Sequence, residues 1–156
     1  MLSFLIFAAA AATPVPPGEE PVDPYVQSNA NAGATVFEGQ GMWHAFHEQP
    51  GIDRIVDDMI DRSLADPQLK QVLEGQDMIR LRRVLKEQFC YILNGGCTYS
   101  GRTMKEAHKD LGIQAKDMNL LVGKLQLAMN KENVSFFAQN RFLSKLAPMR
   151  PDVVTR

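Results

Sequence analysis

Apolar residues recur every three or four positions through most of this chain, which is the spacing of one face of an α-helix. The pattern is clearest over residues 51–65, and that helix is expected to end at Asp66, because a residue before proline disfavours the helical conformation. The same spacing predicts helices over 78–93, 115–130 and 135–148, and no stretch alternates with a period of two. The pattern therefore predicts an all-α fold. The stripe expected to be buried in the first helix is Ile52, Ile55, Val56, Met59, Ile60 and Ser63.

The helix predicted over 78–93 carries both apolar and charged residues. Its inward stripe is expected to be Met78, Leu81, Leu85 and Phe89, and the charged run LRRVLKEQ is expected to form a solvated face. Asn94, Gly95 and Gly96 follow and end the helix, since glycine and asparagine favour the conformation past a helix C-terminus.

The first forty residues differ in character from the rest of the chain. Residues 2–12 are almost entirely apolar but too short to span a bilayer, for which a helix needs about 20 residues. Residues 1–12 are typical of a secretory signal with an Ala-x-Ala site, which predicts export to the periplasm. The alternatives are an uncleaved membrane anchor, or an apolar tail on a cytoplasmic protein. Residues 13–40 are rich in proline and small polar residues and predict a disordered linker, so the globular domain is expected to span 41–156.

Composition excludes several classes of function. The net charge is −1 and the isoelectric point about 6.3, so a nucleic-acid partner is not expected. The sequence lacks a phosphate-binding glycine loop, a nucleophile elbow, an HExxH motif and a CxxC motif. His44 and His47 lie three residues apart, and we interpret them as surface residues, because no third metal ligand accompanies them.

His108 is the unusual residue of a short helix predicted over 103–113 and ended by Gly112. It shares one helix face with Met104, Ala107 and Leu111. An imidazole in apolar surroundings must be hydrogen-bonded or coordinate a ligand, so the alternatives are a core histidine and a metal ligand. Four main helices would make a thin core, and an apolar prosthetic group would fill it.

Four stretches together resemble a group I truncated haemoglobin. They are LADPQLKQVLEGQDMIRLR, NGG, TYSGRTMKEAHKDLGI and LAPMRPDVV, and the resemblance runs over residues 43–154. It implies a shortened globin, a two-over-two helical sandwich around haem b, with His108 as the proximal iron ligand. The other ring nitrogen is then expected to be held by the Met104 carbonyl. The residues expected to contact the haem are Met78, Leu81, Leu85, Met104, Ala107, Leu111 and Ile113.

The chain departs from the family at the positions that would face the bound gas. Ile60 stands where the family has a tyrosine, Leu85 where it often has a glutamine, and Leu73 where it has a phenylalanine. With Leu81 these residues would form a gas pocket almost without hydrogen-bond donors. We therefore expect weak retention of O2 and little penalty for CO or NO. His47 and Glu48 also replace the first of the family's two Gly-Gly pairs.

Three functions remain open from the sequence. The first is reversible binding of a diatomic gas. The second is a haem enzyme or redox protein on the same fold, such as an NO dioxygenase with a reductase partner, or a six-coordinate electron-transfer haem with Met59 as second ligand. The third is a haem-free interaction module. An apolar pocket argues against acid–base catalysis, so gas binding rather than enzymatic activity is expected.

Cys90 and Cys97 flank the Gly-Gly turn. The sequence has no CxxCH motif, so covalent haem attachment of the cytochrome c type is not indicated. A disulfide between them is expected if the protein is exported, and two free thiols otherwise.

Overall fold

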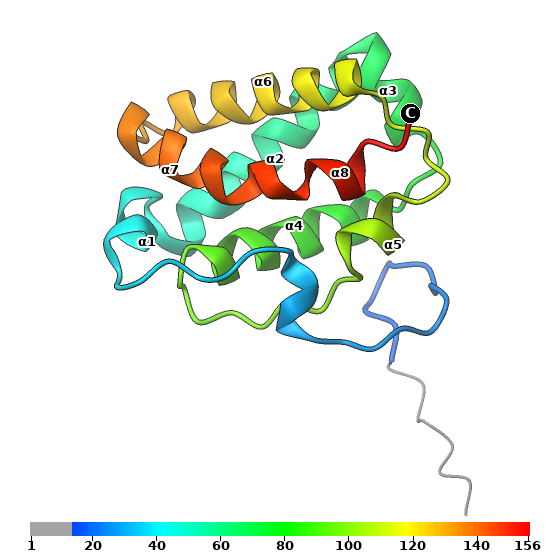
Figure 1. Cartoon of the computed structure of the whole chain (residues 1–156), viewed down its shortest axis with the longest axis horizontal. Helices are drawn as coiled ribbons and strands as arrows, with labels where there is room; N and C mark the ends of the chain where they lie inside the picture. The colour runs from blue at the N-terminus through cyan, green and yellow to red at the C-terminus, as the bar shows by residue number, and fades with distance from the viewer. Residues whose placement is uncertain (1–13) are drawn as a thin grey trace, which may run out of the picture.

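The structure is a computed structural model that describes residues 14–156, so the predicted signal sequence at residues 1–12 lies outside the described residues. Every regular element of residues 14–156 is helical (Figure 1), which confirms the all-α prediction. None of the helices in this part of the chain has the length and apolar character that a membrane span requires. The elements are η1 (Asn29–Ala32), α1 (Gly41–Ala45), α2 (Glu48–Ala65), α3 (Pro67–Leu73), α4 (Met78–Ile92), α5 (Met104–His108), α6 (Ala115–Lys131), α7 (Phe136–Leu146), η2 (Ala147–Met149) and α8 (Arg150–Val153).

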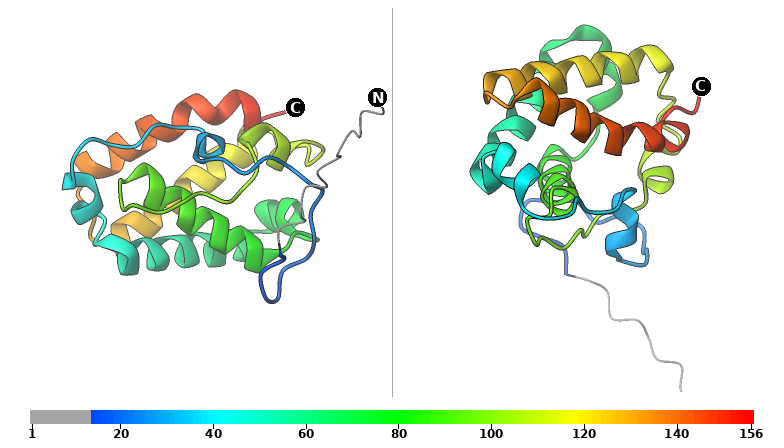
Figure 2. Two further views of the ribbon diagram at one scale, coloured as in Figure 1. Left: turned by 90° about the horizontal axis from the view of Figure 1, so that it is seen from below. Right: turned by 60° about the vertical axis from the view of Figure 1, so that its left-hand side comes forward.

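The long helices form two antiparallel pairs. Helix α2 packs against both α4 and α6, and Figure 2 shows α2 and α4 side by side. Helix α6 and the segment from α7 to α8 run in opposite directions above α4 in Figure 1. The short helix α5 packs against α8, and η1 packs against α4. The one-turn helix α5 is therefore packed against the C-terminal helix of the described chain.

Helix α2 begins at Glu48, three residues before the predicted start, and its first turn is unusual. His47 and Glu48 both have φ of +60°, the left-handed region that favours glycine. These two residues thus adopt the kind of backbone that a Gly-Gly pair would permit. The His47 ring lies 3.1 Å from Glu132, which also accepts a hydrogen bond of 2.6 Å from Arg54. These contacts connect the start of α2 to Glu132, the C-cap residue of α6.

Helix α5 ends at His108 and not near Gly112, so the predicted end at Gly112 is wrong. The chain turns earlier because Lys109 is extended and Asp110 takes a positive φ of 64°. Just beyond, the Ile113 carbonyl accepts backbone hydrogen bonds from Thr155 at 3.0 Å and Arg156 at 3.3 Å. These bonds tie the segment after α5 to the C-terminus, which no local pattern could reveal.

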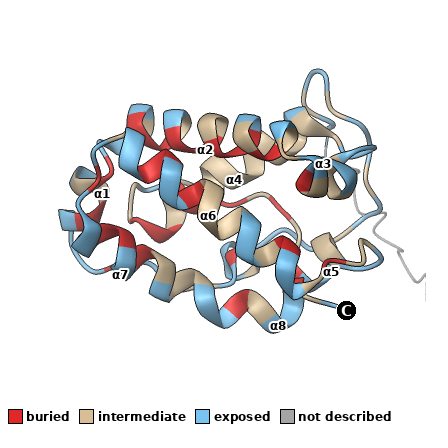
Figure 3. Ribbon diagram, turned by 90° about the horizontal axis from the view of Figure 1, so that it is seen from above, coloured by how far each residue is buried: buried red, intermediate tan, exposed pale blue. Residues whose placement is uncertain are grey.

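Burial, shown along the chain in Figure 3, confirms the whole predicted stripe of α2 but only one of the four predicted residues of α4. All six predicted residues of α2 are buried. On α4, Phe89 is 3% exposed, whereas Met78, Leu81 and Leu85 are half-buried and pack against the edge of the core. The apolar side chains in the first half of α4 are therefore only partly covered by the other helices.

Residues 14–40 differ from the disordered linker expected from composition. We call this segment the N-terminal strap. It packs onto α4 and the following loop, with Ala32 fully buried and Phe37 7% exposed. The Phe37 amide donates to the Ile92 carbonyl at 2.9 Å, and the Gln40 side chain donates to the Asn94 carbonyl at 2.9 Å. Specific anchors of this kind, spaced along the segment, hold it in place without long regular structure.

The charged run of α4 is not simply a solvated face, because it holds the strap. Arg83 forms a bidentate ion pair with Glu19, whose side chain is only 1% exposed. A second guanidinium, that of Arg80, lies 3.6 Å from the same carboxylate. The hydrogen bond from Arg83 holds the pKa of the Glu19 carboxyl below its ordinary value of 4.5. The ionised form of Glu19 therefore stabilises the folded protein.

We predict that Glu19→Gln lowers the free energy of unfolding near pH 7 by about 1–3 kcal/mol, between the values typical of exposed and buried ion pairs. Because the folded pKa of Glu19 is depressed, its contribution is complete above pH 4.5 and is lost as the pH falls further. Urea unfolding at several pH values measures this difference. Glu38→Gln, an exposed position on the same strap, is the control. A difference that persists undiminished well below pH 4.5 would contradict the assignment.

Candidate functional site

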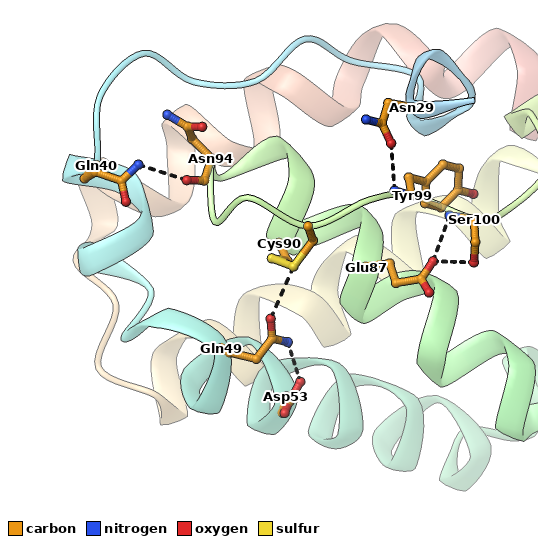
Figure 4. The surroundings of a disulfide bond; sticks show 10 residues. Asn29, Gln40, Gln49, Asp53, Glu87, Cys90, Asn94, Tyr99 and Ser100 are labelled. Atoms are coloured by element: carbon orange, nitrogen blue, oxygen red, sulfur yellow. Dashed lines mark hydrogen bonds between the residues drawn. A yellow bond between two sulfur atoms is a disulfide. The ribbon is translucent and has the colours of Figure 1, made fainter. Parts of the chain in front are cut away.

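The loop that leads to α5 starts at a disulfide. Cys90, fully buried near the end of α4, is bonded to Cys97 with their Cα atoms 5.7 Å apart (Figure 4). Of the two states left open by the sequence, the structure has the bridged one. The bond closes the tight turn in which Asn94 and Gly96 have positive φ, and Gly95 lies so close to the Trp43 ring that no side chain fits there. The direction in which the loop leaves α4 is thereby set.

The strap and α4 hold the middle of the loop from two sides (Figure 4). The Tyr99 amide donates to the Asn29 side chain at 2.9 Å. The Ser100 amide and hydroxyl both donate to the Glu87 carboxylate, at 2.8 and 2.7 Å. The Gly101 carbonyl accepts from the Asn31 side chain at 3.2 Å. The loop has no regular structure, so these side chains satisfy its polar backbone groups in place of a helix or sheet.

Tyr99 folds back over the start of α5. Its ring is 3% exposed, and its hydroxyl donates to the Arg102 carbonyl at 3.0 Å. Burial raises the pKa of Tyr99 to about 12, so the phenol keeps the proton that it donates. Gly101 lies directly against this ring, and any side chain at residue 101 would collide with it. The Tyr-x-Gly spacing is therefore required by the shape of the loop.

Helix α5 presents His108 through a short hydrogen bond within its own turn. The Thr103 hydroxyl caps the helix by accepting from the Glu106 amide at 3.2 Å. His108 Nδ1 lies 2.6 Å from the Met104 carbonyl oxygen, which confirms the partner expected from the sequence. A carbonyl can only accept, so Nδ1 must carry the proton. In the neutral ring Nε2 is then the unprotonated nitrogen, with a lone pair available to a metal.

The electrostatics of the site keep this imidazole neutral. Burial lowers the pKa of His108 from its usual 6.5 and outweighs the opposite effect of the bond to Met104. Among residues 14–156, His108 Nε2 makes no hydrogen bond, and no group of three or more His, Cys, Asp or Glu side chains could hold a metal ion. The donor set therefore fits an iron porphyrin, which needs one neutral imidazole and apolar walls.

The residues predicted to contact the haem come from α4, α5 and the turn after α5. Met104 and Ile113 belong to the buried core at 9% and 8% exposure. Met78, Leu81, Leu85 and Leu111 are half-buried against that core. Ala107 is half-buried outside this apolar cluster. Six of the seven predicted residues thus lie in the apolar core or against it.

The predicted gas pocket contains no hydrogen-bond donor in its four side chains. Ile60 is 1% exposed on α2, and Leu81 and Leu85 are half-buried on α4. Leu73, at the end of α3, is half-buried outside the apolar cluster. Met59, the alternative iron ligand, is buried on α2 at 3% exposure. The nearby hydroxyl of Ser63 is already used, because it donates to the Met59 carbonyl at 2.7 Å.

Sequence reasoning missed three polar residues around the loop. Gln88, treated as part of a solvated run, is only 5% exposed and contacts Met104. Glu87 and Arg83 join the strap to the loop, since Arg83 donates to both Glu87 and Ser100. The one available signal was position. Gln88 lies three residues after Leu85 and next to Phe89, on the inward side of α4.

Comparison with known proteins gives consistent matches. Residues 42–155 match the family described as bacterial-like globin. The group 1 truncated haemoglobin GlbN of Mycolicibacterium paratuberculosis is 31% identical over 104 residues, which is 67% of this chain and 76% of that protein. GlbN of Nostoc commune is 27% identical over 108 residues, or 69% of this chain and 92% of that protein.

Solved structures show the same fold. The 2/2 haemoglobin of Synechococcus sp. PCC 7002, solved in the cyanomet state with covalently attached haem, has a TM-score of 0.68 at 22% identity. The truncated haemoglobin of Tetrahymena pyriformis, in its Fe(III) form, has a TM-score of 0.70 at 19% identity. Each covers 74% of this chain and 98% of the other.

Proposed function

The chain belongs to the bacterial-like globin family, and on that basis we propose that it binds haem b through His108 and reversibly binds a diatomic gas. Membership of this family supports a haem-binding role. The observation that carries the assignment of His108 is its bond to the Met104 carbonyl. That bond directs the proton to Nδ1 and leaves Nε2 for iron.

The haem would supply an iron site at which O2, NO or CO can bind. The residues of the chain would orient the iron ligand and exclude water from the haem. Met104 orients the imidazole, and the half-buried side chains of Met78, Leu81, Leu85 and Leu111 offer an apolar wall that excludes water. Ile60, Leu73, Leu81 and Leu85 add no acid, base or hydrogen-bond donor to the gas side. We therefore propose gas binding in preference to catalysis by a haem enzyme.

We predict that His108→Ala lowers haem affinity at least about tenfold and changes the spectrum of whatever haem remains, because the only proximal ligand is lost. The measurement is the ferrous and ferric absorption spectrum of purified protein, together with the rate of haem loss. His44→Ala is the matched control, since His44 is an exposed residue of α1 that pairs with Glu48. Equal spectra for His108→Ala and the native protein would exclude His108 as the ligand.

A donor placed in the gas pocket should slow the release of O2. We predict that Leu85→Gln slows O2 dissociation about ten- to a hundredfold, since a new hydrogen bond to O2 is worth on the order of 1–3 kcal/mol. CO dissociation should change much less, because CO accepts hydrogen bonds weakly. Stopped-flow exchange of O2 for CO measures the rate. Leu85→Met has a similar size and no donor. The pocket assignment fails if the Met and Gln variants release O2 equally fast.

We also propose that the protein is exported to the periplasm through residues 1–12. The Cys90–Cys97 disulfide supports this proposal, because structural disulfides persist in oxidising compartments and are rare in the bacterial cytosol.

Thiol counting on protein purified from its native compartment and then denatured should find no reactive thiol before reduction and two after it. Denaturation is necessary because Cys90 is completely buried in the folded protein. Two reactive thiols before reduction would reject the bridge in that compartment and the support it gives to export.

A further inference from the structure

Gln88 is a buried polar residue that the haem-binding role does not by itself explain. It lies on α4 at 5% exposure, among side chains that are mostly apolar. Its amide Nε2 donates to the Ala32 carbonyl of the N-terminal strap at 2.8 Å. The same nitrogen lies 3.5 Å from the sulfur of Met104 and 3.7 Å from that of Met149. The two amide hydrogens thus reach the strap on one side and thioether sulfurs on the other.

Met104 connects this amide to the proposed iron ligand. Its sulfur faces Gln88, while its carbonyl oxygen accepts the Nδ1 proton of His108 at 2.6 Å. The backbone of the strap also passes close to the same side chain, because a Cβ atom added at Gly33 would lie only 3.2 Å from Met104 Cγ. The position of Met104, and with it the acceptor for His108, is therefore set from outside α5.

Helix α5 depends on such contacts because it has only five residues. A helix of that length is not stable by itself, so packing against its neighbours must determine where it lies. An apolar residue at position 88 could fill the same space but would give no directional bond. A buried amide with fixed partners specifies one arrangement of the groups around it.

We propose that Gln88 is a positioning residue that orients His108 through Met104, and that the strap, through the Ala32 carbonyl, is part of the proximal site. The inference rests on the proposed function of His108 as the iron ligand. It extends that function to a segment that lies before the globin helices in the sequence.

The test compares Gln88→Met with Gln139→Met in the full chain. Both glutamines are buried, and Gln139 on α7 donates to Asn130 at 2.8 Å and to the Val134 carbonyl at 3.0 Å, with no hydrogen bond to Met104. In haem-free protein, ¹⁵N NMR of the imidazoles reports whether His108 carries its proton on Nδ1. In haem-loaded protein, resonance Raman reports the iron–histidine stretch, and transfer to apomyoglobin reports haem loss.

We expect Gln88→Met to lower the Nδ1–H population of His108, to shift the iron–histidine stretch, and to speed haem loss about three- to tenfold. This is below the 10- to 100-fold typical of losing a direct partner of a ligand. Gln139→Met should leave all three unchanged at comparable stability. Unchanged signals in Gln88→Met, or equal changes in both variants, would overturn the proposal.

Two further results keep the inference separate from the proposed function. If the native protein binds no haem, the proposed function fails, while the NMR comparison in haem-free protein still tests the coupling of Gln88 to His108. If Gln88→Met does not fold, Met104→Leu removes the sulfur that faces Gln88 and keeps the volume. Its control is Met129→Leu, at a fully buried methionine of α6. An Nδ1–H signal of His108 that is equal in these two variants would likewise overturn the proposal.

Discussion

The hydrogen bond from His108 Nδ1 to the Met104 carbonyl is the interaction on which this site depends. It selects one tautomer of a half-buried imidazole and so leaves Nε2 unprotonated, the nitrogen that we propose as the iron ligand. Burial works in the same direction, because it lowers the pKa of the ring and keeps it neutral. A five-residue helix presents both partners, so the surroundings of α5 matter as much as α5 itself.

Those surroundings come from parts of the chain that are far apart in sequence. The disulfide determines where the loop leaves α4, and Asn29 and Glu87 hold its middle from opposite sides. The C-terminal residues bind the Ile113 carbonyl beyond the histidine. These contacts give hydrogen-bond partners to polar backbone groups around α5. Such partners are required because an unpaired backbone group near the core is energetically unfavourable. The N-terminal strap is one of these supports and belongs to the same folded unit.

The two halves of helix α4 lie in different environments. Its C-terminal half enters the core through Phe89 and Cys90, whereas Met78, Leu81 and Leu85 stay half-buried. Polar residues divide in a similar way, since Arg83 and Glu87 hold the strap and loop while Gln88 reaches Met104. The proposed haem site would use the half-buried part of α4 as a wall, which would explain why the apolar stripe of α4 is less buried than that of α2.

The sequence by itself determined the helices, the buried stripe of α2 and the histidine that interrupts an apolar face, because helical periodicity is a local property. It also predicted the Met104 carbonyl as the partner of His108, one turn away. Only the tertiary structure decided the early end of α5, the packing of the strap and the burial of Gln88. The partners that hold the strap and bury Gln88, such as Glu19 with Arg83 or Ala32 with Gln88, are more than fifty residues apart. Their pairing exists only once the helices have packed, so no pattern along the chain can show it.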